Sequence, residues 1–352
     1  MKAIGIEAGA DEPRLFEVTR PEPSPGDVLV RTLRVGVDGT DREVVAGAHG
    51  GPPVDDDYLV LGHEAVGVVV DPTTTEFERG DVVVPMVRRP PPSGANEYFE
   101  RAEPDMAPPS ACVERGIDGA HGFMSEYFTS PAQYLIPVPD AYAEWGFLVE
   151  PISITEKALE LAYASRSSFS WTPETALVLG NGPLGLITTA MLAPDLDTYC
   201  LGRRDRPDPS IDFVEALGAT YVDSRETPVD AVATVHEPMD LVYEATGHAK
   251  HAVQSVDALA PNGVVALLGV PGAREVTFDG GRFHKDLVVS NKAVVGSVNS
   301  GPRHFHAAVD RLSGLPSQVL DDYVTEIAPV DRFETALTPD ATMKTAVEFS
   351  TL

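Results

Sequence analysis

Residues 175–185 read Thr-Ala-Leu-Val-Leu-Gly-Asn-Gly-Pro-Leu-Gly, a short apolar strand followed by three closely spaced glycines. These glycines suit a tight turn, close approach of a pyrophosphate to the backbone, and close packing of the next helix on the strand. The first turn of that helix would offer free amides and the positive end of its dipole to phosphate groups. Strand, turn and helix in this order predict a dinucleotide site, whereas a glycine turn needed only for structure is the alternative. The predicted contacts are Gly180, Asn181, Gly182, Pro183, Leu184 and Gly185.

The sequence around this turn alternates apolar strands with periodic helical segments. The expected helices span residues 156–165 and 184–192, and the expected strands span residues 176–179, 198–201, 241–243 and 264–268. Fully apolar short strands are typical of parallel sheets that are buried on both faces. Alternation of this kind predicts a doubly wound α/β domain.

Two arginines follow the next predicted strand, about twenty residues beyond the glycines. An NAD enzyme places a carboxylate here to bind the ribose hydroxyls, whereas arginine accommodates a 2′-phosphate. Arg203 and Arg204 therefore predict that NADP is preferred and that NAD is tolerated. The alternative is that they form surface ion pairs with Asp205 or Asp208.

The first 150 residues have a different pattern of apolar and turn-forming residues. Valine-rich runs at residues 28–30, 66–70 and 82–84, separated by Gly, Pro and Asp, predict an irregular β domain. Residues 88–109, rich in proline and polar side chains, are expected to form a long surface loop. A length of 352 residues also favours two domains over one.

Composition narrows the class of protein. The 26 basic and 54 acidic residues give a net charge of −28, which makes nucleic acid a poor partner. An acidic disordered chain is the alternative, but the 43% apolar content favours a folded protein adapted to high salt. In molar salt the Debye length is only about 3 Å, so repulsion between surface carboxylates is screened. No long apolar run or secretory signal is evident, and Cys112 and Cys200 are expected to be buried thiols in a reducing cytoplasm.

Three short motifs carry possible metal ligands. Residues 35–40 read Val-Gly-Val-Asp-Gly-Thr, residues 61–67 read Leu-Gly-His-Glu-Ala-Val-Gly, and residues 147–152 read Phe-Leu-Val-Glu-Pro-Ile. A His-Glu pair on a loop is by itself more often solvated than ligating. Taken together, however, the three motifs have the order and spacing seen in the medium-chain alcohol dehydrogenase superfamily. The sequence resembles that superfamily along its whole length, and within it the glucose dehydrogenases of halophilic archaea.

The resemblance implies a catalytic zinc ion held by Asp38, His63 and Glu150, with Asp38 in place of the cysteine that is usual in the superfamily. Three protein ligands leave the fourth tetrahedral position open, as a catalytic zinc site requires. An aspartate makes the site harder and less selective for zinc than a cysteine does. By the same resemblance, Glu64 either ligates the metal transiently or holds its bound water. Structural zinc is not expected, because the loop that carries four cysteines in many relatives ends here with Cys112 alone.

The resemblance also implies substrate and cofactor contacts. Thr40 matches the position whose hydroxyl contacts the reacting alcohol and relays its proton, with a turn-capping threonine as the alternative. The implied substrate contacts are Thr40, Glu64, Arg88, Arg89, Asn96, Glu114, Glu150 and Asn299. Further implied cofactor contacts are Thr246, Val270 and Asn299. For the polar residues of this set, plain surface loop is the alternative.

The expected architecture is a GroES-like irregular β domain with a Rossmann domain. The zinc-binding domain is expected at residues 1–155, completed by residues 296–352, and the NADP-binding domain at residues 156–295. The implied reaction is oxidation of the anomeric hydroxyl of glucose to gluconolactone, without resolution between glucose and galactose. A zinc-dependent polyol or alcohol dehydrogenase, and a dinucleotide sensor without catalysis, are the rival hypotheses. The resemblance further implies a homodimer or a tetramer, and no membrane partner.

Overall fold

The computed structural model describes residues 1–338 and 343–352. The chain divides into two compact units, of which the first comprises Met1–Ser153 and Asn299–Leu352 and the second comprises Ile154–Val298. The first boundary falls within helix α3 (Val149–Arg166). None of the helices in these described ranges combines the length and apolar character needed to cross a bilayer.

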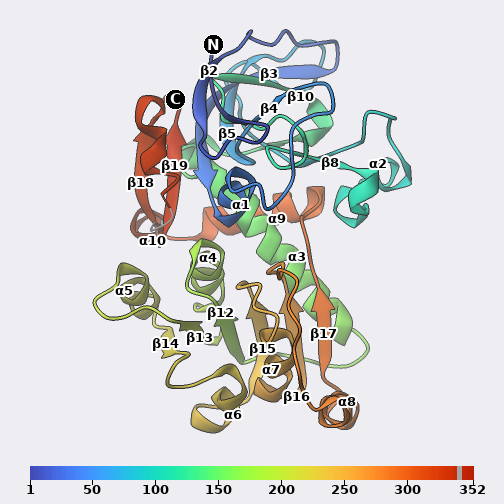
Figure 1. Cartoon of the computed structure of the whole chain (residues 1–352), viewed down its shortest axis with the longest axis vertical. Coiled ribbons are helices and arrows are strands. Elements are labelled where there is room, and N and C mark those ends of the chain that lie inside the picture. Colours follow the sequence, from blue (N-terminus) through green and yellow to red (C-terminus); the bar gives the residue numbers. More distant parts are fainter. Residues whose placement is uncertain (339–342) are drawn as a thin grey trace. The chain divides into compact units, whose positions relative to one another are not determined.

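The second unit is built on a six-stranded parallel sheet. Its strand order is β14-β13-β12-β15-β16-β17, which can be followed from strand to strand in Figure 1. The strands are β12 (Thr175–Leu179), β13 (Asp197–Gly202), β14 (Thr220–Asp223), β15 (Met239–Glu244), β16 (Leu259–Leu267) and β17 (Ala293–Gly296). In this order the chain starts in the middle and reverses direction beside β12, as in dinucleotide-binding domains. The doubly wound domain predicted from the sequence is thereby confirmed.

Helices connect these strands. They are α4 (Pro183–Leu192), α5 (Pro209–Ala216), α6 (Val232–Val235), α7 (His251–Ala258) and α8 (Gly280–Val289). Helix α4 begins directly after the glycine turn, with Pro183 in its first turn, where the fixed φ of proline suits a helix and its missing N–H is not needed. Strand β12 is buried along its whole length, as expected for a strand covered on both faces.

In its described residues, the first unit contains three β-sheets and several helices. The largest sheet has the order β11-β6-β5-β3-β19-β18, with β10 paired to β3; the smaller sheets are β2-β1-β4 and β7-β8-β9. The strands are β1 (Lys2–Glu7), β2 (Arg14–Glu17), β3 (Asp27–Val37), β4 (Tyr58–Val60), β5 (Glu64–Asp71), β6 (Val82–Pro85), β7 (Arg88–Arg89), β8 (Val113–Arg115), β9 (Gly119–Ala120), β10 (Tyr127–Pro131), β11 (Leu135–Pro137), β18 (Val324–Pro329) and β19 (Lys344–Glu348). The helices are α1 (Gly39–Val45), α2 (Glu97–Glu100), α9 (Pro302–Gly314) and α10 (Ser317–Tyr323).

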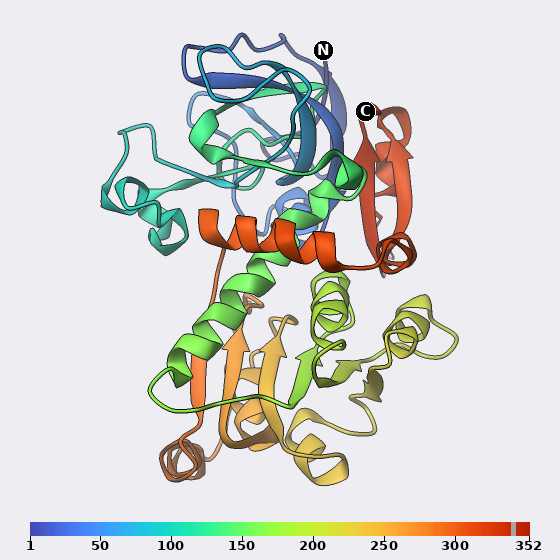
Figure 2. The same ribbon diagram turned by 180° about the vertical axis from the view of Figure 1, so that it is seen from behind.

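The C-terminal strands complete the sheet that begins near the N-terminus. Strand β19 pairs antiparallel with β3, and β18 pairs parallel with β19. Figure 2 shows this red pair beside the blue strands of the N-terminal part. Strand β3 therefore lies between β5 and β19, so that residues from both ends of the sequence meet across it.

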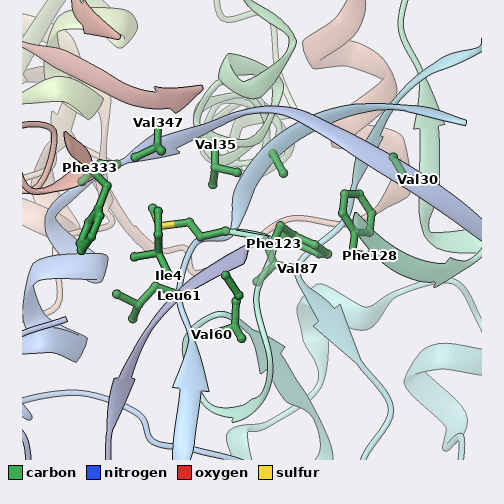
Figure 3. Close-up of a cluster of buried hydrophobic side chains, with 14 of the residues drawn as sticks. Ile4, Val30, Val35, Val60, Leu61, Val87, Phe123, Phe128, Phe333 and Val347 are labelled. Atoms are coloured by element: carbon green, nitrogen blue, oxygen red, sulfur yellow. The ribbon is translucent and has the colours of Figure 1, made fainter. Parts of the chain in front are cut away.

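The valine-rich runs form the core of this first unit. Figure 3 shows Val30 and Val35 of β3 packed with Ile4, Leu61 and Phe123. Burying an aliphatic or aromatic side chain of this size contributes roughly 1.5–3 kcal/mol. The core therefore fixes the neighbouring ends of β3 and β5, which carry the metal-site motifs.

The prediction that residues 88–109 form one long surface loop is wrong. Arg88 and Arg89 form strand β7 and are only 4% and 7% exposed. The segment also contains helix α2 and a 3₁₀ turn at Pro104–Met106. The arginines can be buried because their guanidinium groups donate hydrogen bonds to backbone carbonyls, Arg88 to that of Asp105 and Arg89 to that of Met86. Composition does not reveal these hydrogen bonds.

Candidate metal centre and cofactor site

Asp38 sits at the junction between strand β3 and helix α1. It is the N-cap of α1, and its Oδ1 accepts a hydrogen bond from the Asp41 amide at 3.1 Å. Its Oδ2 accepts one from the Thr40 hydroxyl at 3.2 Å and lies 3.7 Å from His63 Nε2. A capped helix start holds the Asp38 side chain in one place, with one oxygen turned to the histidine.

His63 directly precedes strand β5, and Glu64 is the first residue of that strand. Both side chains are buried, at 4% and 1% exposure. The register pairs Gly36 of β3 with Glu64, which sets the end of β3 beside the start of β5. The strand pairing thus brings two motifs about 25 residues apart in sequence together at one edge.

Glu150 enters from the start of helix α3 and is 5% exposed. In the parts of the chain that the structure describes, its carboxylate has neither a hydrogen bond nor an ion pair. Burying an ionised carboxylate without a partner costs free energy, so a bound cation would stabilise this group. Ligand atoms of His63, Glu64 and Glu150 lie within 4.8 Å of one another, as do those of Asp38, Asp41 and His63.

The residues present fit a zinc ion. One imidazole is shared by two clusters of carboxylates, and both sets are buried or partly buried. Nitrogen and carboxylate oxygen are ligands that zinc takes at catalytic sites. Among the described residues, the three predicted ligands fall in two clusters that share His63, one with Asp38 and the other with Glu150.

Proton affinities across the cluster are strongly shifted. Burial raises the pKa of Glu150 to about 8 and that of Glu64 to about 7. Burial opposes charge at Asp38 as well, but His63 and Lys344 outweigh it and lower the pKa of this carboxyl. Burial likewise disfavours the charged form of His63, whereas Asp41 and Asp38 together raise the pKa of the imidazole well above its ordinary value. With these side chains alone, both His63 and Glu150 are therefore protonated at neutral pH.

Zinc affinity should consequently rise with pH. Zinc needs neutral imidazole and ionised carboxylate, so binding displaces protons from His63 and Glu150 below about pH 8. We expect the apparent affinity to increase by roughly tenfold per pH unit for each proton displaced between pH 6 and 8. Competition with a chromogenic chelator across this range measures the slope. A flat profile would contradict the assignment of these groups as ligands.

Two residues of this region were not predicted from the sequence. Asp41 is fully buried, and its Oδ1 lies 3.5 Å from His63 Nδ1, where a carboxylate can orient a metal-binding imidazole. Its sequence signal is the spacing of three residues after Asp38, typical of a capping box. Lys344 is paired with Glu64, and its signal is that it is one of only six lysines in the chain.

The structure brings three of the expected sugar contacts together. Glu114 Oε1 accepts hydrogen bonds from Arg88 Nε at 2.9 Å and from Asn299 Nδ2 at 3.1 Å. The Asn299 amide oxygen accepts from the Ser300 amide at 2.8 Å. Ser300 Oγ lies 2.6 Å from Ser153 Oγ, which donates to the Glu150 carbonyl. A chain of hydrogen bonds thus connects this polar group with the segment that carries Glu150.

Arg89 and Asn96 occupy different surroundings. The Arg89 guanidinium donates to the Met86 carbonyl at 2.6 Å and stacks on Tyr134. Asn96 caps helix α2, and its amide donates to the Ala111 carbonyl at 2.8 Å. These contacts are structural, and they connect neither side chain with Glu114.

The glycine turn has the geometry that a pyrophosphate needs. A Cβ at Gly185 would lie 1.8 Å from the Gly180 carbonyl oxygen, so this position must be glycine for α4 to pack on β12. A Cβ at Gly182 would meet nothing within 4 Å, which leaves the backbone open beside the first turn of α4. Asn181 anchors the turn by donating to Ser210 Oγ at 2.8 Å. The turn therefore fits the dinucleotide predicted from the sequence.

Arg203 and Arg204 follow strand β13 and are exposed. In residues 1–338 and 343–352 neither guanidinium forms an ion pair, because Asp205 pairs with Arg225, and Asp208 caps helix α5. The alternative of surface ion pairs with Asp205 or Asp208 is therefore not seen. Both guanidinium groups remain available to a 2′-phosphate.

Thr246 lies beside the same turn, and Val270 lies beside Gly247, the residue after Thr246. A Cβ at Gly180 would come within 3.0 Å of Thr246 Cγ2, and one at Gly247 would come within 2.8 Å of the Val270 carbonyl oxygen. The Thr246 hydroxyl lies 2.8 Å from His251 Nδ1 and is hydrogen-bonded to buried Glu244. The carboxyl ends of β12 and β15 thus meet where ligands bind in sheets of this type.

Together, the sheet order, the glycine turn and the histidine–carboxylate cluster define a metal-dependent dehydrogenase of the medium-chain class. A family model described as "Glucose dehydrogenase C-terminus" matches residues 143–349, and one described as "Alcohol dehydrogenase GroES-like domain" matches residues 24–140. The chain therefore belongs to the glucose dehydrogenase family of this class. The expected combination of a GroES-like domain with a Rossmann domain is confirmed.

Relatives support this assignment along the whole chain. Glucose 1-dehydrogenase of Haloferax mediterranei is 62% identical, and that of Halobacterium salinarum is 58% identical, each with 100% of both chains covered. A solved structure of the Haloferax mediterranei enzyme in complex with NADP, Zn and gluconolactone has a TM-score of 0.98 and covers 100% of both chains. The 2R,3R-butanediol dehydrogenase of Bacillus subtilis, at 23% identity, a TM-score of 0.80 and 99% coverage of both chains, shows the shared fold.

Proposed function

We propose that this chain is a zinc-dependent glucose 1-dehydrogenase that oxidises the anomeric hydroxyl of D-glucose to gluconolactone and passes the hydride to NADP. The observation that carries the proposal is the buried Glu150 carboxylate beside His63, which has no hydrogen bond or ion pair with any described residue. The Haloferax mediterranei enzyme, 62% identical over the whole chain, binds the corresponding product, metal and cofactor. NADP is the preferred cofactor, and NAD is tolerated.

Asp38, His63 and Glu150 hold the zinc ion in this proposal. Zinc supplies Lewis-acid chemistry, which lowers the pKa of a sugar hydroxyl and so favours departure of a hydride. The Thr40 hydroxyl, hydrogen-bonded to Asp38, holds and relays the proton that leaves the sugar. Glu64 lies beside His63 as a further carboxylate that can reach the metal.

Glu114, Arg88 and Asn299 form the sugar-recognition group. A site built to hydrogen-bond sugar hydroxyls rejects compounds that lack them, because its own polar groups would be left unpaired. Gly180, Asn181, Gly182, Pro183, Leu184 and Gly185 bind the pyrophosphate, and Thr246 and Val270 line the same end of the sheet. Arg203 and Arg204 bind the 2′-phosphate.

Steady-state rates on glucose, galactose, xylose, sorbitol and ethanol, in molar salt with and without a chelator, test this function. We expect turnover of glucose with NADP that a chelator removes and added zinc restores. A preference for ethanol or sorbitol would overturn the sugar assignment. Full turnover by zinc-stripped protein would overturn the metal assignment.

Substituting Glu114 tests the sugar-recognition group. Glu114→Gln keeps the shape but removes the charge that accepts from Arg88 and Asn299. We expect KM for glucose to rise about 10- to 100-fold, since hydrogen bonds to charged groups contribute about 1.5–3 kcal/mol. Zinc content should not change. The exposed Glu97→Gln is the matched control, and equal KM values for all three proteins would rule out the role of Glu114.

We further propose an assembly and a location for the protein. Strand β17 is an edge of the six-stranded sheet, and Val288, Val289, Val294 and Val298 around it are 37–69% exposed. Apolar side chains gathered at an unpaired sheet edge suit contact with a second copy of the chain. We therefore propose a dimer, or a tetramer of dimers, whose copies meet at the β17 edge. Light scattering in molar salt distinguishes these states from a monomer.

The proposed location is the cytoplasm, because the buried free thiols of Cys112 and Cys200 suit a reducing compartment.

A further inference from the structure

A fully buried charge pair lies beside the predicted zinc ligands. Lys344 Nζ is ion-paired with Glu64 Oε2, and the two side chains are 0% and 1% exposed. The same ammonium group donates to the Val37 carbonyl at 3.1 Å. Val37 directly precedes the proposed ligand Asp38, and Glu64 directly follows the proposed ligand His63. Lys344 therefore contacts a neighbour of each of these two ligands.

The sheet is built to let these two side chains meet. Strand β3 lies between β5 and β19, and Gly36 is opposite Glu64 on one side and opposite Ala346 on the other. Lys344 lies two residues from Ala346 and therefore points to the same face of the sheet. A Cβ at Gly36 would lie 2.2 Å from Glu64 Oε2 and 3.0 Å from Lys344 Cε. Only glycine at this position leaves room for the pair.

Glu64 is also within reach of the metal. One of its oxygens lies within 4.8 Å of the ligand atoms of His63 and Glu150. A carboxylate at this distance can fill the coordination position that a substrate needs. The same carboxylate is held by a fully buried ammonium group, which salt does not screen as it screens surface pairs. Lys344 and the zinc ion are therefore competitors for Glu64.

We propose that Lys344 is a positioning residue that holds Glu64 away from the metal and so keeps the fourth coordination position open for the sugar. The proposal rests on the zinc site of the proposed function. It assigns a role to a residue about 280 positions from Glu64 in the sequence, and it explains why a lysine is buried in a chain with so few of them.

The test compares zinc affinity in four proteins. These are the wild type, Lys344→Met, Glu64→Gln, and the double variant. In Lys344→Met the freed Glu64 becomes an additional ligand, so zinc should bind about tenfold more tightly or better, the range by which groups outside the ligand set change metal affinity. Glucose turnover should fall, because the fourth position is occupied. Glu64→Gln should bind zinc as the wild type does, because Glu64 is not a resident ligand.

The double variant separates positioning from simple charge repulsion. If Lys344 acts through Glu64, removing the lysine has no effect on zinc affinity once residue 64 is glutamine. If the lysine only repels the metal, Lys344→Met tightens zinc binding equally in both backgrounds, which overturns the proposal. The absorption spectrum of the cobalt-substituted protein gives a second readout. It should change in Lys344→Met and return to the wild-type form in the double variant.

Failure of this proposal differs from failure of the proposed function. If the wild type neither binds zinc nor oxidises glucose, the function is wrong. If the wild type does both and Lys344→Met matches it in zinc affinity and cobalt spectrum, only the role of Lys344 is wrong. Should Lys344→Met fail to fold, Glu64→Gln still decides, since a tenfold or greater loss of zinc affinity in that variant would make Glu64 a resident ligand.

Discussion

Glu150→Gln is expected to lose zinc binding while making the zinc-stripped protein more stable at alkaline pH. The carboxylate is buried, it lacks a hydrogen bond or ion pair within the described residues, and burial raises its pKa to about 8. Ionising it inside the protein costs free energy, and an amide of the same shape avoids this cost. A group whose pKa is raised in the folded state destabilises the fold as pH rises above its unfolded value. Unfolding in denaturant at pH 9, with zinc removed, should show the increase in stability.

The same substitution removes a charged ligand. Removing a residue that hydrogen-bonds to a metal ligand lowers metal affinity or activity about 10- to 100-fold. Removing a ligand itself should therefore lower zinc affinity by at least about 100-fold. We expect kcat to fall by about 1,000-fold, since Lewis-acid stabilisation supplies several kcal/mol. The exposed Glu144→Gln, in the same segment, is the matched control. Wild-type zinc affinity in Glu150→Gln would refute the proposed ligand set.

Replacing Arg203 and Arg204 together by alanine is expected to change the cofactor preference. Both side chains are exposed at the end of β13, and neither guanidinium forms an ion pair in the described part of the chain. Hydrogen bonds to charged groups contribute about 1.5–3 kcal/mol each, so two contacts with a 2′-phosphate predict at least a 100-fold rise in KM for NADP. KM for NAD should stay within about threefold, because NAD lacks this phosphate.

Arg206→Ala is the control for this change. Arg206 lies in the same loop, but its guanidinium is paired with Glu215. Direct titration of NADP and NAD by fluorescence adds a measurement that is independent of turnover. An equal loss of both cofactors in the double variant would indicate damage to the loop and would contradict a role in recognising the 2′-phosphate.

Local sequence determined the nucleotide-binding turn and four strands of the sheet around it. The spacing of Gly180, Gly182 and Gly185 after an apolar strand is typical of one kind of turn, because Gly180 and Gly185 meet local steric demands and Gly182 leaves the backbone open to a pyrophosphate. Strands β12, β13, β15 and β16 were recognisable because a parallel sheet covered on both faces needs nearly continuous apolar runs, whereas β14 was not predicted. For the metal site, the candidates Asp38, His63 and Glu150 came from motifs that resemble a known superfamily, and the structure places Asp38 and Glu150 in two clusters that share His63.

Only the tertiary structure decided what surrounds those motifs. Lys344 meets Glu64 because β3 lies between β5 and β19, and strand order and register across the whole chain are not written in any local pattern. Arg89, which the sequence predicted in a surface loop, can be buried because its guanidinium group donates a hydrogen bond to the Met86 carbonyl. Local sterics act within a few residues and can be read from them, whereas burial and charge pairing depend on which distant strands become neighbours.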